Sequence, residues 1–299
     1  ELHLRAFQGG TVNFTGNLVD SGASTYYVPV IIDGGGVVNL SGTSSYSGGT
    51  YVQAGTLNLD FAHSVATSNI LNNVVISGTL GDIGNKSALT LGGGNLNLSG
   101  KASTANSQRF NGATVAAGAS SISFVQGDAS NTIALNLGNL SRQAAGTLDV
   151  TLAGSTQDNT NGVLASNLNT SNGVLVSAAS NGVAFATVGG RDWAGVSGSN
   201  IVGFTSYDTD SFAANANTDV VSDQSATGAT INTLRFNDTT ARTVTLSGVN
   251  TIATGGILVT DQTAANGATI TGGSLRSGDG KELVLINNGK LEIGSSIVD

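Results

Sequence analysis

The chain has 299 residues, a formal net charge of −8, one proline and no cysteine. Its 11 Lys and Arg residues are scattered singly, so no basic patch can neutralise phosphates, and we expect neither a nucleic-acid partner nor an anionic membrane surface. The lack of cysteine excludes disulfides and thiolate metal sites, and we expect no cofactor. No apolar run approaches the ~18 residues of a membrane helix, so we expect no membrane insertion by this segment.

The first part of the chain predicts short strands at residues 11–15 and 26–32. Pro29 cannot donate to a strand ladder, so it indicates an edge or the start of a strand. Residues 34–42 (Gly-Gly-Gly-Val-Val-Asn-Leu-Ser-Gly) recur closely as residues 92–100. Looser repeats of a strand with a glycine corner lie at residues 55–59, 74–78, 111–115, 146–150, 244–248, 266–270 and 289–294. Residues 61–71 are the best helical candidate, but they lack an apolar stripe and predict a loop or one helical turn.

Recurring short strands without intervening helices are compatible with a sandwich, a closed barrel or a solenoid. Asn-Gly pairs begin at residues 111, 161, 172, 181 and 266, and they suit the hairpins of a sandwich or the corners of a solenoid. The repeated Gly-rich corners favour the solenoid, in which Asn and Ser side chains of successive coils can stack along the axis. We therefore predict an all-β, single-stranded parallel β-helix with roughly 20 to 25 residues per coil.

Residues 155–225 follow the strand pattern less regularly and contain the single Trp of the chain, Trp193, with Tyr207 close in sequence. Both rings are expected to cover the core where a loop leaves the stack. A sharper hypothesis makes them a candidate ligand platform that stacks on sugar faces. The polar run that ends this section predicts a solvated loop or one weakly held calcium ion, with Asp208, Asp210, Asp219 and Asp223 as ligands.

Residues 40–59 contain Ser-Gly, Tyr-Ser-Gly-Gly-Thr and Gly-Thr-Leu in a regular order. On these residues the stretch resembles the autotransporter-associated β-strand repeat of passenger regions, with Ser44-Ser45 in place of the frequent Asn-Thr. The matching positions are Ser41, Gly42, Tyr46, Gly48, Gly49, Thr50, Gly55, Thr56 and Leu57. Residues 188–194, 243–248 and 255–259 are similar to large surface proteins of planctomycete-like bacteria. The resemblance implies a right-handed parallel β-helix that is secreted or displayed on the cell surface, and it implies no catalytic activity.

Groups suited to catalysis are sparse. The chain has two histidines, His3 and His63, and no nucleophile elbow, so a hydrolase triad is not indicated. Its glutamates are Glu1, Glu282 and Glu292, and its aspartates are mostly dispersed, so the paired carboxylates of a glycosidase are not evident. Because residues one coil apart are neighbours in a solenoid, a polysaccharide lyase or glycoside hydrolase on a β-helix scaffold stays open as the alternative.

Together, these patterns predict one elongated β-helix over residues 1–299, with a loop-rich section near 155–225, as a fragment of a larger chain. The predicted function is that of a non-catalytic, extracellular structural or adhesive module of a bacterial surface protein or fibre. The expected partners are extracellular glycans or further copies of the chain, which would associate end to end or laterally because coil ends expose strand edges.

Overall fold

The computed structural model describes residues 1–299 except 21–27, 74–86, 153, 155–156, 178–181 and 264, so predictions that fall there, including the strand at 74–78 and Asn181, lie outside the described residues. The described part is all-β, as predicted, and its helical content is two short 3-10 turns, η1 (Phe61–His63) and η2 (Asp261–Thr263). None of its helices is long and apolar enough to cross a bilayer.

The chain divides into two compact units. Unit 1 comprises Glu1–Asn167 and Ser197–Ile201, and unit 2 comprises Leu168–Val196 and Val202–Asp299. The expectation of one continuous β-helix over the whole chain stays a prediction.

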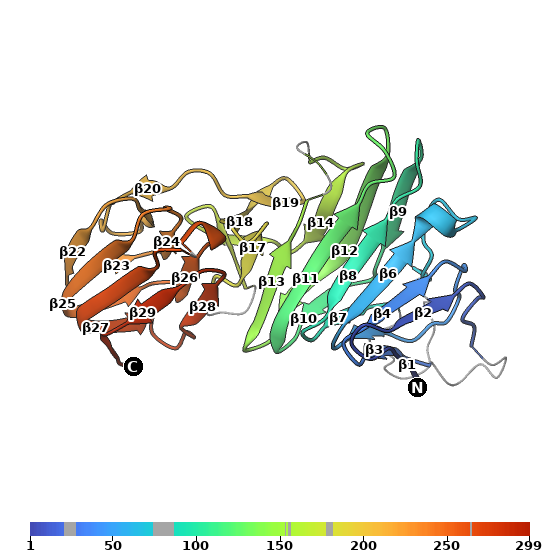
Figure 1. Cartoon of the computed structure of the whole chain (residues 1–299), viewed down its shortest axis with the longest axis horizontal. Helices are drawn as coiled ribbons and strands as arrows, with labels where there is room; N and C mark the ends of the chain where they lie inside the picture. The colour runs from blue at the N-terminus through green and yellow to red at the C-terminus, as the bar shows by residue number, and fades with distance from the viewer. Residues whose placement is uncertain (21–27, 74–86, 153, 155–156, 178–181, 264) are drawn as a thin grey trace. The chain divides into compact units, whose positions relative to one another are not determined.

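Three parallel sheets form unit 1 (Figure 1). The first contains β1 (Leu2–Arg5), β3 (Val30–Asp33), β5 (Thr50–Val52), β7 (Leu89–Leu91), β10 (Ala113–Val115) and the end of β12 (Thr132–Arg142). The second contains β2 (Thr11–Phe14), β4 (Val37–Leu40), β6 (Thr56–Asp60), β8 (Asn95–Ser99), β11 (Gly118–Val125) and β13 (Gly146–Val150). The third contains β9 (Ala105–Arg109), the start of β12 and β14 (Gly162–Ser166), and β19 (Asn200–Gly203) pairs antiparallel with β14. In the first two sheets, each return of the chain adds a parallel strand beside the previous one.

Alternation along the strands of the second sheet builds the core of unit 1. Val38, Leu57, Leu96, Ile122 and Val150 stand in one register row, and all five are buried. Their chain neighbours are polar except for Val37, and they point to the opposite face because successive side chains of a strand alternate. Burying each such aliphatic side chain contributes roughly 1.5–3 kcal/mol, so the stacked row stabilises the sheet against a shift of register.

Unit 2 contains two further parallel sheets. One has β20 (Asp208–Thr209), β21 (Asn217–Val220), β24 (Thr233–Phe236), β26 (Gly256–Val259) and β28 (Val284–Asn287). The other has β22 (Gln224–Thr227), β23 (Thr230–Ile231), β25 (Arg242–Ile252), β27 (Ala268–Ser277), β29 (Leu291–Ile293) and β30 (Ser296–Ile297). Buried Phe236, Val244, Ile257 and Ile270 belong to the shared core of these sheets.

A small antiparallel part of unit 2 consists of β15 (Asn169–Ser171), β16 (Val174–Val176), β17 (Ala186–Val188) and β18 (Asp192–Ser197). Asn172 and Gly173 connect β15 to β16 with φ of 46° and 85°, so this Asn-Gly pair forms a tight hairpin turn. The pairs at residues 111, 161 and 266 instead precede strands of parallel sheets, and their glycines also adopt positive φ. In the described residues, Asn-Gly pairs therefore occur both in a hairpin turn and before parallel strands.

Candidate functional site

The glycines of the repeat motif allow neighbouring turns of the chain to approach closely. A Cβ on Gly42 would lie 1.9 Å from the carbonyl oxygen of Gly16, and a Cβ on Gly48 would lie 2.3 Å from that of Val28. Gly55 has φ of 68°, and its Cβ would lie 2.4 Å from a backbone oxygen. A side chain at any of these positions would force the stacked backbones apart.

Several polar groups of the motif form hydrogen bonds within the protein. The Tyr46 hydroxyl is buried and lies 2.6 Å from Thr50 Oγ1, and burial raises the pKa of this hydroxyl although the bond to Thr50 opposes the shift. Backbone bonds to neighbouring strands or corners involve the amides of Ser41, Thr50 and Thr56 and the carbonyl of Gly49. Leu57 is fully buried. The motif thus allows successive turns of the chain to pack closely against one another in unit 1.

Trp193 and Tyr207, the candidate ligand platform, pack together in unit 2. The Trp193 side chain is 0% exposed within a core cluster, so its ring is not available to stack on a ligand in this structure. The Trp193 amide donates to Tyr207 Oη at 2.8 Å, and the Phe204 ring meets the Tyr207 ring edge to face at 4.9 Å. This arrangement favours the interpretation that both rings cover the core.

The Arg235 guanidinium lies over the ring of Tyr207, 3.4 Å from the centroid of that ring. It donates two hydrogen bonds to Asp219, at 2.9 and 2.7 Å, and one to Asp192. Burial raises the pKa of the Tyr207 hydroxyl, and the Arg235 charge only partly offsets this shift. The buried charges are therefore paired within unit 2, and they fix the segment that follows β19.

The four aspartates considered as calcium ligands bind different partners. Asp208 accepts from the Asn217 amide, Asp210 from Ser222 and the Val221 amide, Asp219 from Arg235, and Asp223 from the Thr243 amide. Burial acts to raise the pKa of Asp210, but the hydrogen bonds from Ser222 and the Val221 amide outweigh it, so the pKa is lowered. Across the described residues, no group of three or more His, Cys, Asp and Glu side chains is placed to hold a metal ion.

His3 joins a charged cluster at the surface of unit 1. Its ring nitrogens lie 3.2 Å from Glu1 and 3.2 Å from Asp33, and hydrogen bonds to Glu1 and then Asp33 raise the pKa of His3. Arg5 forms a two-bond ion pair with Asp33, at 2.7 and 2.8 Å, and lowers the pKa of Asp33 to about 2. The cluster pairs opposite charges across the β1–β3 ladder.

A row of asparagines runs across the outer face of the second sheet. The side-chain amide of Asn39 donates to Asn13 at 2.7 Å, that of Asn58 to Asn39 at 2.9 Å, and that of Asn97 to Asn58 at 2.8 Å. Ser123 continues the row by donating to Asn97 at 2.9 Å. We call these five residues the asparagine ladder. Stacking of Asn and Ser side chains, expected from the sequence, occurs here on strands.

A groove of about 330 Å³ lies where the ladder begins. Its lining combines two ladder residues with hydroxyl groups, a carboxylate and an imidazole, and consists of Asn13, Phe14, Thr15, Asn39, Ser41, Asp60 and His63. Side-chain alternation directs Asn13 and Thr15 to the outer face and the Phe14 ring to the core side. The groove is therefore a polar site on the face of the sheet, built by three successive strands.

The start of η1 holds His63 in place. Phe61 is fully buried and anchors the turn, while Asp60 caps it by accepting from the His63 amide at 3.3 Å. The same carboxylate lies 2.8 Å from Nδ1 of His63, whose side chain is 82% exposed. When neutral His63 donates from Nδ1 to Asp60, its Nε2 is left as a hydrogen-bond acceptor. Nε2 has no hydrogen-bond partner among the described residues.

Sequence reasoning placed residues 61–71, which include His63, in a loop or one helical turn, and it missed this groove. A partial signal was present in the tripeptides of asparagine, an apolar residue and a polar residue that begin at residues 13, 39, 58 and 97. Each of these four lies at or near the end of a strand of the second sheet, but the same pattern also occurs at residues 95, 139 and 167, so it does not by itself mark the ladder or the groove.

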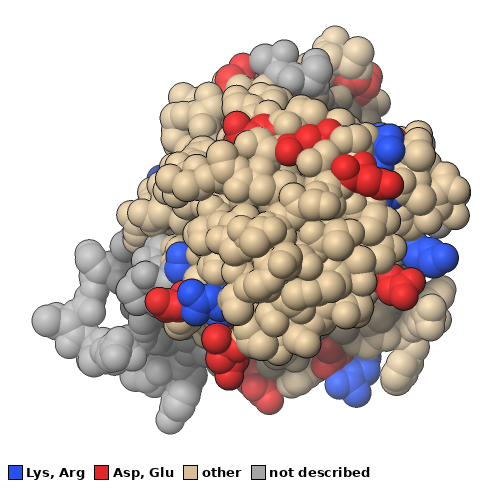
Figure 2. Space-filling view, turned by 90° about the vertical axis from the view of Figure 1, so that its left-hand side faces the viewer, with Lys and Arg blue, Asp and Glu red and all other residues tan. Residues whose placement is uncertain are grey.

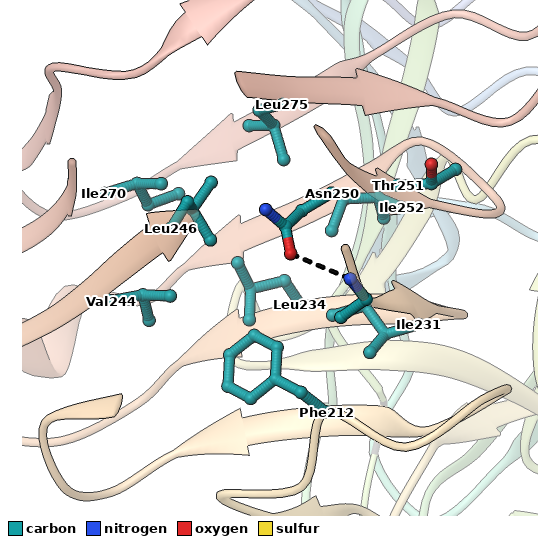
Figure 3. Close-up of a pocket in the computed structure, with 11 residues that line it drawn as sticks. Phe212, Ile231, Leu234, Val244, Leu246, Asn250, Thr251, Ile252, Ile270 and Leu275 are labelled. Carbon is teal, nitrogen blue, oxygen red and sulfur yellow. Dashed lines mark hydrogen bonds between the residues drawn. The ribbon is translucent and has the colours of Figure 1, made fainter. Parts of the chain in front are cut away.

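Unit 2 also contains a small void of about 10 Å³ lined by Phe212 and ten other residues (Figure 3). Its walls are mostly apolar, with Val244, Leu246 and Leu275 among them, and Asn250 Oδ1 is occupied by the Ala229 amide at 2.9 Å. This volume is about the minimum for one water molecule, and an apolar void of that size stays dry. We interpret it as a packing defect.

Charged side chains are sparse on the face of unit 2 that bears β22 and β25. Figure 2 shows acidic and basic groups there singly or in small mixed groups near the rim, with an uncharged middle. The expectations about nucleic acid and membrane partners stay predictions.

No protein-family model matches the chain, and no solved structure matches it. The chain is 29% identical over 273 residues to the adhesin BmaC autotransporter of Brucella suis biovar 1 (strain 1330). The alignment covers 85% of this chain and 7% of that protein, so the chain spans only a small part of the relative's length. The chain is thus similar to an autotransporter adhesin, in keeping with the motif at residues 40–59. The similarity to planctomycete-like proteins stays a prediction.

Proposed function

We propose that this chain is a non-catalytic structural and adhesive module of a secreted or surface-displayed bacterial protein. The observation that carries the proposal is the stack of six parallel strands in the second sheet, held by a buried aliphatic row inside and the asparagine ladder outside. Such a stack presents side chains on a stiff face, which suits adhesion. Similarity to an autotransporter adhesin supports the same function and location.

The proposed fold of this stack is a right-handed parallel β-helix. Its support is that the chain alternates between the first and second sheets and adds a parallel strand to each on every return. Connections between parallel strands of one sheet are right-handed in nearly all proteins. A crystal or cryo-EM structure with left-handed connections or antiparallel stacking would overturn this part of the proposal.

The groove supports binding in preference to hydrolysis. Its lining contains one carboxylate, Asp60, whereas glycoside hydrolysis employs two carboxyl groups on either side of the scissile bond. Release of reducing ends from neutral or acidic polysaccharides by the purified chain would replace the proposal with the enzymatic alternative.

Adhesion can be tested with beads coated with the purified chain and applied to cultured cells, matrix proteins and polysaccharide-coated surfaces. We expect saturable attachment to at least one surface, and no attachment when the coated chain has been heat-denatured. Attachment to none of these surfaces, or equal attachment by native and denatured chains, contradicts the adhesive function.

Self-association is the second interaction that we propose. Leu2, Leu4, Val12 and Phe14 face the core side of β1 and β2 but are only half-buried, unlike the fully buried residues of the next strands. Strand edges with accessible apolar rows favour pairing with another chain. Sedimentation at high concentration should reveal oligomers, and a monomer at all concentrations would refute this interaction.

A further inference from the structure

We propose that the groove at the start of the asparagine ladder binds a neutral saccharide of one or two rings. This inference rests on the proposed adhesive function and gives it a binding site and a class of ligand. The site consists of Asn13, Thr15, Asn39, Ser41, Asp60 and His63.

The charge of the lining selects against anionic ligands. No Lys or Arg is among the residues that line the groove, and Asp60 supplies a negative charge. Phosphate, sulfate and carboxylate groups are recognised in proteins mainly by Arg, Lys or clustered backbone amides. An acidic sugar or a phosphorylated ligand would therefore meet repulsion without a compensating cation.

The hydrogen-bonding groups match sugar hydroxyls, which donate and accept at once. Asn39 Nδ2 donates to Asn13 Oδ1, and this bond leaves the Asn13 amide hydrogens as donors with no partner among the described residues. When neutral His63 donates from Nδ1 to Asp60, its Nε2 is available to a ligand as an acceptor. The hydroxyls of Thr15 and Ser41 can do either. Because the ladder and the cap of η1 fix these groups before binding, little conformational entropy is lost when a ligand binds.

The middle of the groove offers no free strand edge to a peptide. β4 pairs with β2 on one side and with β6 on the other, so its backbone groups are occupied. A ligand that lies over β4 is therefore recognised by side chains. A volume of about 330 Å³ is at the small end of ligand pockets and suits one or two sugar rings.

The test uses the full chain and a panel of neutral hexoses, N-acetylhexosamines and their disaccharides, with sialylated, glucuronylated and sulfated sugars beside them. Binding is measured by saturation-transfer NMR and calorimetry. We expect binding of at least one neutral saccharide and none of the acidic ones. His63→Ala and Asn39→Ala should each weaken that binding about fivefold or more, as the loss of one hydrogen bond predicts.

Asn97→Ala is the matched control, because Asn97, like Asn39, donates to one ladder residue and accepts from another but lies outside the groove. It should leave saccharide affinity within about twofold, since it removes no group from the site. Binding that tolerates both groove variants, a preference for acidic sugars, or no binding of any neutral saccharide overturns the inference.

The bead assay separates this inference from the function on which it rests. If wild-type beads attach to a surface and neither free saccharide nor His63→Ala reduces attachment, the groove is not the adhesive site, while the adhesive function stands. If wild-type beads attach to no surface, the adhesive function fails whatever the groove binds.

Discussion

Replacing Gly42 by alanine tests whether successive turns of unit 1 are in direct backbone contact. The new Cβ would lie 1.9 Å from the Gly16 oxygen, far closer than carbon and oxygen can approach, so the two segments must separate. Overpacking costs about 1–3 kcal/mol, and the nearby bond from the Ser41 amide to the Phe14 carbonyl is worth about 1 kcal/mol more. The expected destabilisation is about 2–4 kcal/mol.

Hydrogen exchange measured by mass spectrometry on peptides that cover β2, β4 and β6 reports this change locally. A loss of about 2–4 kcal/mol raises the population of the open state about 30- to 700-fold, because each 1.4 kcal/mol is a factor of ten. Gly92→Ala is the control, since its Cβ would lie 3.9 Å from the nearest atom, at Gln53, and its φ is not positive. If both variants are protected to the same extent, the close approach at Gly42 is wrong.

Two further predictions concern charge. Arg235→Met should destabilise unit 2 by about 3–5 kcal/mol, because it leaves the buried carboxylate of Asp219 unpaired. Urea denaturation followed by the fluorescence of the single Trp should detect this loss. An unchanged denaturation midpoint contradicts the buried pairing. Hydrogen bonds that His3 donates to Glu1 and then to Asp33 raise the pKa of His3 above 6.5, so its contribution to stability should be complete below pH 6.5 and decline as pH rises through the raised pKa. A decline of equal size in His3→Gln would show that another group is responsible.

Much of unit 1 follows from local pattern. Alternation around Leu57 and Leu96, with glycine before each strand, predicted strands that the structure contains at Thr56–Asp60 and Asn95–Ser99. The all-β class followed because no stretch carried a helical stripe, and the best candidate, residues 61–71, provides only the 3-10 turn η1. These features depend on side-chain period and corner residues, which a sequence displays directly.

Register could not be predicted in the same way. The ladder joins residues 26, 19, 39 and 26 positions apart, whereas a regular coil of 20 to 25 residues was expected. Variable corners between the strands absorb these differences, so residue spacing does not reveal which asparagines meet. The groove was missed for the same reason, since it gathers residues from Asn13 to His63.

Trp193 shows a different limit of sequence reasoning. An isolated aromatic residue in an irregular section suits both a core and a binding platform, because the ring is apolar and its nitrogen is polar. Which of these occurs depends on burial, and the ring is fully enclosed by a cluster that includes Val174, Phe204 and Leu258.

The asparagine ladder also has a direction. Every side-chain donor in it belongs to the later strand and every acceptor to the earlier one, from Ser123 back to Asn13. Aligned amide dipoles polarise one another, so each rung strengthens the next. The hydrogen bonds of the ladder therefore all run in one direction, and the side-chain amide of Asn13 is left as an unsatisfied donor at its end. A strand laid beside β2, whether from this chain or another, could extend it only by offering an acceptor: Asn, Asp, Ser or Thr would continue the row, and Lys or Arg would end it.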